Sequence, residues 1–200
     1  MSKRSYLKLL IKRILVTAII IAVGIYSFTL LASSVTENTD DYIYELPFGK
    51  GTSHKIVQGY GGLFAHNHLA ALDFGMPEGT PVYAAREGTI YRFKDDSDEG
   101  GPFPSYNKKA NFIMIQHSNG SIGCYWHLKK NGVVTKTGHV SKGDLIGYSG
   151  YTGFTLRPHL HFSVKKKLTY DKDSFVKTKF RTTNGVEWLQ NKNIYRRPVN

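Results

Sequence analysis

The sequence predicts a mostly β domain with an antiparallel sheet core, preceded by one N-terminal transmembrane helix. Two observations carry this prediction. Beyond residue 33, short apolar runs alternate with clusters of Gly, Pro, Asn and Asp, and little of the sequence has helical periodicity. Before that point, residues 14–32 form one long run without a charged residue. The chain beyond this run is long enough for one domain with its own core.

The uncharged run of residues 14–32 fits a membrane span. Its 19 residues would extend roughly 28 Å as a helix, close to the bilayer core of about 30 Å. The basic residues 1–13 precede it, so the positive-inside rule predicts a cytoplasmic N-terminus and an extracytoplasmic domain. Two interpretations stay open: a single-pass anchor in the cytoplasmic membrane, or a signal peptide whose cleavage releases a secreted protein. The length and continuity of the run favour the anchor.

Charge and cysteine content exclude some classes of protein. The formal net charge is +12, and because five positive charges precede residue 14, the remainder carries about +7. A basic surface suits a membrane or an anionic cell-wall polymer, and it equally serves simple solubility. No basic motif with interleaved aromatic residues indicates a nucleic-acid partner. The single cysteine, Cys124, excludes an intramolecular disulfide, and its apolar run SIGCYWHL favours a buried, inert thiol.

The rest of the chain divides into a linker, a domain and an extension. Residues 33–55 are predicted to be a polar linker, residues 56–168 the folded domain, and residues 169–200 a C-terminal extension packed on it. Residues 95–109 are too polar and too rich in Gly and Pro for a strand or helix, which predicts a long loop of the kind that often carries function. The predicted strands are TPVYAA (80–85), GTIYRF (88–93), NFIMIQH (111–117), SIGCYWHL (121–128), GVVTKT (132–137), DLIGYSG (144–150) and HLHFSV (159–164).

Three of the histidines in predicted strands have apolar neighbours on both sides. If HLHFSV is a strand, His159 and His161 point to one face and Leu160 to the other. A site that uses two imidazoles fits this pattern, and so does a solvated face. His127 lies between Trp126 and Leu128, and taken alone it favours a core histidine with one hydrogen bond.

Asp73 is the carboxylate whose position most needs an explanation. It lies between Leu72 and Phe74, where a carboxylate must be paired, hydrogen-bonded or bound to a cation. His66 and His68 precede it, and two histidines with one carboxylate are a common ligand set for catalytic zinc. A buried structural hydrogen-bond acceptor is the alternative for Asp73.

Motifs that occur in order between Gly59 and Val164 resemble a known family. They are HNHLAALDFGMPEGTPVYAAREG, YWHL and GDLIGYSGYTGFTLRPHLHFSV. Together they are similar to the lysostaphin and LytM type of zinc metalloprotease, hydrolases of the cell wall that act as DD- or glycyl-endopeptidases. The resemblance implies the antiparallel core of that peptidase type, Zn²⁺ as cofactor, and cross-links or stem peptides of bacterial peptidoglycan as substrate.

The resemblance also implies roles for individual residues. It implies that His66, Asp73 and His161 hold the zinc, and that His127 and His159 are catalytic and help to activate the attacking water. His68 is the alternative to His66, since the commonest family spacing, three residues between the first histidine and the aspartate, fits neither. A related group with extra residues after a sequence like FAH favours His66.

Some relatives of this type have lost metal ligands. The resemblance therefore also allows a second class of function, a catalytically silent wall-binding protein that regulates or activates other wall hydrolases. A complete ligand set distinguishes the two and favours the enzyme.

Overall fold

The computed structural model describes residues 14–19, 39–61, 69–169 and 174–200. The chain divides into two compact units, residues 1–37 and residues 38–200. In the first unit, residues 14–19 are helical. Across the described ranges, no helix has the length and apolar character that crossing a membrane requires. The remainder of the predicted transmembrane run, residues 20–32, lies outside the described residues, as does the basic segment 1–13.

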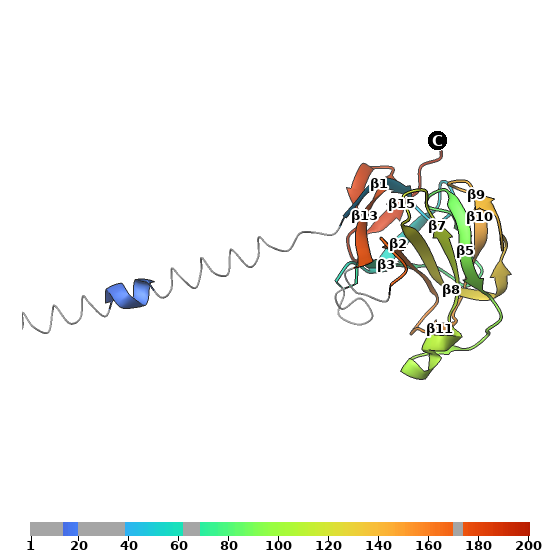
Figure 1. Ribbon diagram of the computed structural model, residues 1–200, viewed down its shortest axis with the longest axis horizontal. Helices are drawn as coiled ribbons and strands as arrows, with labels where there is room; N and C mark the ends of the chain where they lie inside the picture. The colour runs from blue at the N-terminus through green and yellow to red at the C-terminus, as the bar shows by residue number, and fades with distance from the viewer. Residues whose placement is uncertain (1–13, 20–38, 62–68, 170–173) are drawn as a thin grey trace, which may run out of the picture. The chain divides into compact units, whose positions relative to one another are not determined.

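The second unit is a β domain, as the sequence predicts (Figure 1). Within the described part of the chain, 13 strands join in one sheet system whose main path runs β15-β2-β3-β12-β8-β7-β5-β9. All pairs along this path are antiparallel, while the pairs β1–β13 and β6–β11 are parallel. The central strands β3, β12 and β8 therefore lie side by side, although they are far apart in the sequence.

In the main path, β3, β12 and β8 have β2 and β15 on one side and β7, β5 and β9 on the other. The strands are β1 (Thr39–Glu45), β2 (Ser53–Gln58), β3 (Ala71–Gly75), β4 (Pro81–Tyr83), β5 (Gly88–Lys94), β6 (Gly100–Gly101), β7 (Asn111–Gln116), β8 (Ile122–Val133), β9 (His139–Val140), β10 (Leu145–Ser149), β11 (Gly153–Phe154), β12 (His159–Lys165), β13 (Phe175–Thr182), β14 (Gly185–Trp188) and β15 (Ile194–Arg196), with one 3₁₀ helix, η1 (Pro104–Lys109).

The core lies on one face of the central strands. In β12, Leu160 and Phe162 are buried in the hydrophobic cluster, and in β3 the same is true of Leu72 and Phe74. Because side chains alternate along a strand, the residues between them point to the opposite face. The alternation thus places the polar residues of β3 and β12 together on one side of the sheet. Cys124 of β8 is fully buried, as predicted.

Parts of the predicted linker, residues 33–55, belong to strands in the structure. Residues 39–45 form β1, which pairs with β13, and Tyr44, Leu46 and Phe48 are fully buried in the core. The segment looks polar because acidic residues surround its aromatic ones. Tyr44 is nevertheless buried, since its hydroxyl donates a hydrogen bond to Asp40 and so keeps a polar partner inside the fold.

The described part of the predicted C-terminal extension also contributes strands. β13 pairs with both β1 and β12, β14 pairs with β13, and β15 pairs with β2. Val176, Phe180 and Tyr195 are buried in the main hydrophobic cluster. This part of the chain therefore shares one core with the central strands.

Residues 95–109, predicted to be a loop, hold the short strand β6 and the helix η1. Pro104 lies in the first turn of η1, where its fixed φ suits a helix start. β6 pairs with β11, and a β-carbon on Gly100 would overlap the carbonyl oxygen of Tyr151. Only glycine permits this close approach, which holds the segment against the residues that precede His159.

Candidate active site

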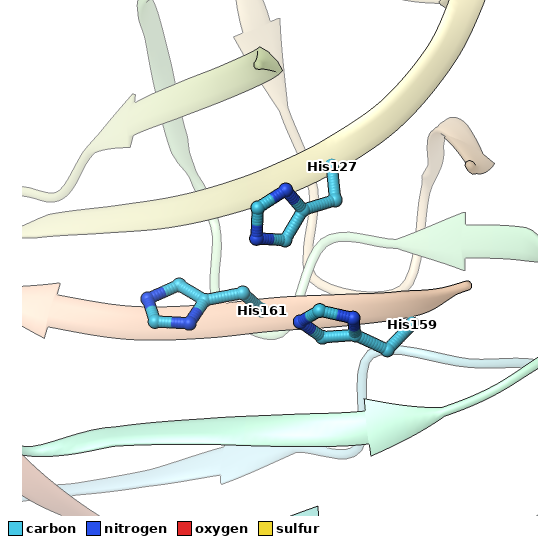
Figure 2. Close-up of side chains that lie close together, drawn as sticks. All are labelled: His127, His159 and His161. Atoms are coloured by element: carbon cyan, nitrogen blue, oxygen red, sulfur yellow. The ribbon is translucent and has the colours of Figure 1, made fainter. Parts of the chain in front are cut away.

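Strand register brings the predicted site residues together. In the pairing of β3 with β12, Asp73 lies directly opposite His161. On its other side His161 pairs with Trp126 of β8, next to His127. The pairs of rings His127–His159 and His127–His161 have centroids 4.6 and 6.0 Å apart. Figure 2 shows the three imidazoles gathered from the two neighbouring strands.

His127 reaches this group through a β-bulge. Along β8, Trp126 pairs with Phe112 and Leu128 pairs with Asn111, so His127 is the extra residue between them. Its φ is 64°, in the left-handed region that residues other than glycine rarely adopt. Such strained backbone persists where the surrounding structure holds it, and it concentrates at functional sites. The bulge turns the imidazole toward β12.

Backbone carbonyls fix the tautomers of two histidines. Nδ1 of His127 lies 2.6 Å from the carbonyl oxygen of Thr152, and Nδ1 of His159 lies 2.9 Å from that of Arg157. Because a carbonyl oxygen only accepts hydrogen bonds, each Nδ1 carries the proton. Each Nε2 then keeps its lone pair, free for a proton or a metal ion.

Asp73 is paired within the site, as its apolar sequence context predicts. It is 6% exposed, and its Oδ1 lies 2.9 Å from Nδ1 of His161 and 3.5 Å from Nε2 of His159. The N–H at Nδ1 of His161 stabilises this buried carboxylate, and a cation shared with the imidazoles would do the same.

Burial and neighbouring charges set the protonation of two histidines. Burial, followed by the proximity of His159 and His161, lowers the pKa of His127 to about 3, so this ring is neutral at neutral pH. Burial also lowers the pKa of His159. The hydrogen bond that the protonated ring donates to Asp73 and the negative charge of Asp73 raise this pKa by more than burial lowers it, so the net shift is upward.

The described residues offer two overlapping sets of metal ligands. One nitrogen each of His127, His159 and His161 lie within 4.8 Å of one another. Alternatively, Asp73 and His161 present an oxygen and a nitrogen 2.9 Å apart. Two ligand atoms at zinc distances in a tetrahedron lie roughly 3.3 Å apart, so a small shift accommodates an ion. His66 and His68, the predicted first ligands, lie outside the described residues.

The histidines lie in a groove of about 490 Å³. Such a volume is typical of a site that holds several residues of a peptide or a small molecule. Apolar side chains from two parts of the chain line it, Val57 of β2 on the one hand and Phe154 of β11 with Leu156 on the other. The lining residues are Val57, Gln58, Asp73, Pro102, His127, Phe154, Thr155, Leu156, Arg157, His159 and His161.

Sequence reasoning missed three residues that organise the site. Thr152 and Arg157 act through their carbonyl oxygens, described above, and Thr155 places its Oγ1 3.1 Å from Nδ1 of His159. Thr155 also donates a hydrogen bond to the carbonyl oxygen of Arg157 at 2.7 Å. Backbone carbonyls belong to every residue type, so the sequence holds no signal for the first two. For Thr155 the sequence does hold a signal, since a hydroxyl only four residues before His159 can lie within hydrogen-bonding distance of its ring.

The sequence of this chain is similar to those of known endopeptidases. The peptidoglycan DD-endopeptidase ShyA of Vibrio cholerae is 38% identical over 93 residues, which cover 46% of this chain and 19% of that protein. The glycyl-glycine endopeptidase ALE-1 of Staphylococcus capitis is 35% identical over 115 residues, 55% of this chain and 29% of that protein. The chain thus matches less than a third of the length of either relative.

A solved structure and a family model complete the comparison. The catalytic domain of the antimicrobial peptidase lysostaphin from Staphylococcus simulans is 26% identical, with a TM-score of 0.44, and the match covers 62% of this chain and 86% of that domain. The model of peptidase family M23 matches residues 66–173, more than half of the chain. This chain is a member of peptidase family M23.

Proposed function

We propose that the protein is a zinc-dependent endopeptidase that hydrolyses peptide cross-links or stem peptides of bacterial peptidoglycan. The observation that carries the proposal is the convergence of three imidazoles and one buried carboxylate at a groove of about 490 Å³. Two relatives, a peptidoglycan DD-endopeptidase and a glycyl-glycine endopeptidase, support the substrate class.

The donor atoms present fit zinc. Zinc in catalytic sites is bound by histidine nitrogens and a carboxylate oxygen, with one position left open. Asp73 and His161 supply one donor of each kind on neighbouring strands. We assign these two residues, with His66 or His68 as the third, to the metal. A zinc ion held there supplies a Lewis acid that polarises the peptide carbonyl and makes water more acidic.

His127 and His159 act on the reacting groups. Both keep Nδ1 protonated against a carbonyl oxygen, so both present a lone pair at Nε2. Such a nitrogen accepts the proton of the attacking water and then donates it to the leaving amine. The hydrogen bonds at Nδ1 hold each ring in one orientation, which keeps the accepting atom aimed at the groove.

The first metal ligand can be assigned by exchange of one histidine at a time. We propose His66, because the sequence FAH before it resembles the related group with extra residues. His66→Ala is then expected to lose bound zinc, and His68→Ala to keep it, as measured by metal analysis of the purified proteins. The reverse pattern assigns the ligand to His68.

We also propose that the domain works outside the cytoplasm and is tethered through residues 14–32. The proposal rests on the uncharged run and on the basic residues before it. Protease added to spheroplasts is expected to digest the membrane-associated protein, which intact cells protect. Protection in spheroplasts would place the domain in the cytoplasm and contradict the proposal.

The activity itself is tested on intact cell walls. The full chain, purified with zinc, is incubated with sacculi that contain either direct or glycine cross-links, with and without a chelator. We expect peptide fragments that appear only without chelator, and mass spectrometry of these fragments names the bond that is cut. If zinc is bound and neither wall type releases peptide fragments, the enzyme is excluded and the silent regulator of other wall hydrolases takes its place.

A further inference from the structure

Arg157 stands at the wall of the groove beside a proposed catalytic residue. Its carbonyl oxygen accepts hydrogen bonds from His159 Nδ1 and Thr155 Oγ1, and its backbone N–H donates to Thr155 Oγ1 at 3.3 Å. Pro158 follows and restricts the backbone of Arg157 further. The backbone of Arg157 is therefore fixed with respect to His159, and the start of its side chain is fixed with it.

The guanidinium of Arg157 is available to a ligand. The residue is exposed, and among the described residues its side chain makes no ion pair. The carboxylate that lines the same groove, Asp73, is held between His159 and His161 instead. The groove thus has a positive charge on its wall, and its own carboxylate, Asp73, is already paired.

The surroundings of this charge strengthen its interaction with an anion. Leu156 is 71% exposed and lies next to Arg157, while Val57, Pro102 and Phe154 line the same groove. A peptide that covers these apolar side chains excludes water, and charge-assisted hydrogen bonds are stronger in such surroundings. The planar guanidinium matches a carboxylate with two parallel hydrogen bonds.

We propose that Arg157 determines specificity by binding a substrate carboxylate on the carbon bonded to the scissile nitrogen. Within a peptide the main-chain carboxylates are consumed in amide bonds. A free carboxylate next to a scissile amide therefore comes from a C-terminal residue or from the second centre of a diamino dicarboxylic acid in a direct cross-link. Cross-links made only of internal glycines carry none. The inference rests on the proposed function and narrows its substrate class.

The test compares matched synthetic substrates with the full, zinc-loaded chain. One pair is a directly cross-linked stem-peptide dimer with that carboxylate free or converted to a carboxamide. The second pair is a monomeric pentapeptide with a free or amidated C-terminus. The measured quantity is the ratio of kcat/KM for the carboxylate form over the carboxamide form, and the pair with the high ratio identifies the source of the carboxylate.

We expect a ratio of about 10 to 100 for one of these pairs, the range for a hydrogen-bonded charge pair. Arg157→Gln should bring the ratio close to one, while Arg157→Lys should keep part of it. Arg196→Gln removes the same charge from an exposed position of β15 that does not line the groove, and should keep the full ratio. A purely structural role of Arg157 would lower kcat/KM for both forms alike and leave the ratio unchanged.

Four results would overturn the inference. A kcat/KM ratio near one in the unmodified protein shows that Arg157 does not bind the carboxylate. A high ratio that persists in Arg157→Gln shows the same. Hydrolysis of glycine cross-links without hydrolysis of either carboxylate substrate also rejects it, but leaves the proposed function intact. Absence of hydrolysis on every substrate rejects the proposed function, and the inference with it.

Discussion

The histidines of the groove and His117 make the same first contact but have different surroundings. His127 and His159 direct Nδ1 to a backbone carbonyl, and His117 does so too, with its Nδ1 2.7 Å from the carbonyl oxygen of Glu87. The difference lies at the other nitrogen. Nε2 of His159 lies 3.5 Å from Asp73 in the groove, whereas Nε2 of His117 is buried and meets no hydrogen-bond partner among the described residues.

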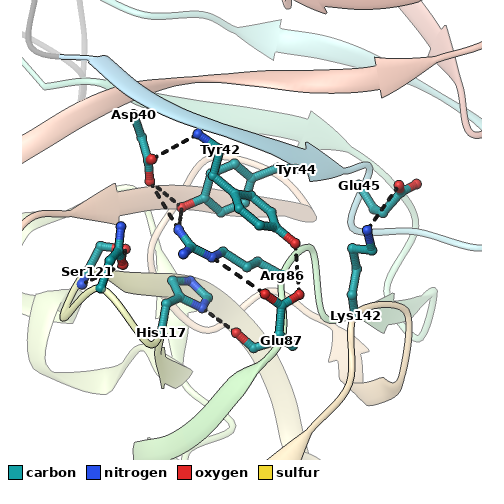
Figure 3. A network of polar contacts seen from close by, with 10 residues as sticks. Asp40, Tyr42, Tyr44, Glu45, Arg86, Glu87, His117, Ser121 and Lys142 are labelled. Atoms are coloured by element: carbon teal, nitrogen blue, oxygen red, sulfur yellow. Dashed lines mark hydrogen bonds and ion pairs between the residues drawn. The ribbon is translucent and has the colours of Figure 1, made fainter.

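His117 belongs to a polar cluster whose central side chains, those of Tyr44, Arg86 and His117, are buried (Figure 3). At its centre Arg86, 5% exposed, lies 3.4 Å from Asp40 and stacks 3.9 Å over the ring of Tyr42. The hydroxyl of Tyr44 donates to Asp40 at 2.7 Å and that of Tyr42 donates to Glu87 at 2.8 Å. These contacts tie β1 to the segment between β4 and β5, which holds Arg86 and Glu87.

The comparison shows that residue type alone does not make a site. Both clusters contain histidine and carboxylate, and in both a carbonyl fixes the tautomer. Only around the groove do the remaining nitrogens converge on space that a substrate can enter. The buried cluster around His117 and Arg86 is therefore expected to control stability, and the open cluster at the groove to control metal binding and turnover. Substitutions in the two clusters test this difference in role.

The largest effect is expected from Asp73→Ala. Loss of this carboxylate removes a proposed zinc ligand and the partner of two imidazoles, so kcat/KM should fall by at least about 10³-fold. Assays of cross-link hydrolysis with added zinc measure it. Asp96→Ala is the matched control, because the side chain of Asp96 is 79% exposed. Full activity of Asp73→Ala would remove Asp73 from the site.

A large effect on stability is expected from Arg86→Met. The change leaves Asp40 without its cation inside the fold, which should lower the free energy of unfolding by about 3 kcal/mol. Zinc content should not change. Urea denaturation measures the loss, with Arg196→Met as the exposed control. A shift no larger than that of the control would show that the buried cluster does not stabilise β1.

A comparable effect should appear as a dependence on pH. Burial lowers the pKa of His117 to about 4, below its ordinary value of 6.5. As the pH falls below 6.5 the unfolded chain binds a proton that the folded chain does not, so stability is lost between about pH 6.5 and pH 4 and no further below that. The loss is about 3 kcal/mol over this window.

The comparison of variants isolates this titration from that of the carboxylates. Unfolding of the unmodified protein and of His117→Gln is followed from pH 7 to pH 4. The free energy of unfolding of the unmodified protein should fall more steeply than that of the variant. Parallel curves would mean that His117 is protonated in the folded state.

The smallest effect is expected from Thr155→Val, which acts through His159. The valine keeps the shape of threonine but removes the hydroxyl that contacts Nδ1 of His159 and the carbonyl of Arg157. Rate constants kcat should fall about 5- to 10-fold, as for one lost hydrogen bond, with zinc content unchanged. Thr155→Ser should restore most of the rate. A serine variant as slow as the valine variant would exclude the hydroxyl as the cause.

Much of the fold was predictable from local patterns. Alternation along residues 159–164 predicts that Leu160 enters the core while His159 and His161 share the other face, as the structure shows. The apolar neighbours of Asp73 likewise predict its burial. In each case the deciding information lies within a few residues of the chain.

What could not be predicted depends on contacts between distant residues. Residues 39–45 pair with β13, more than 130 positions later, so no local pattern shows that they belong to the sheet. The bulge at His127 likewise results from the pairing of β8 with β7. The open position of Arg157 depends on which residues line the groove opposite it, and these come from separate parts of the chain.

Zinc content tests most directly whether His161 binds the metal while His127 acts only in catalysis, as proposed. The unmodified chain, His127→Ala and His161→Ala are purified in parallel, and bound zinc per chain is measured by elemental analysis. We predict one zinc in the unmodified chain and in His127→Ala, which should be inactive, and none in His161→Ala. Loss of zinc from His127→Ala, or its retention in His161→Ala, would contradict the account and assign the metal to a different set of ligands.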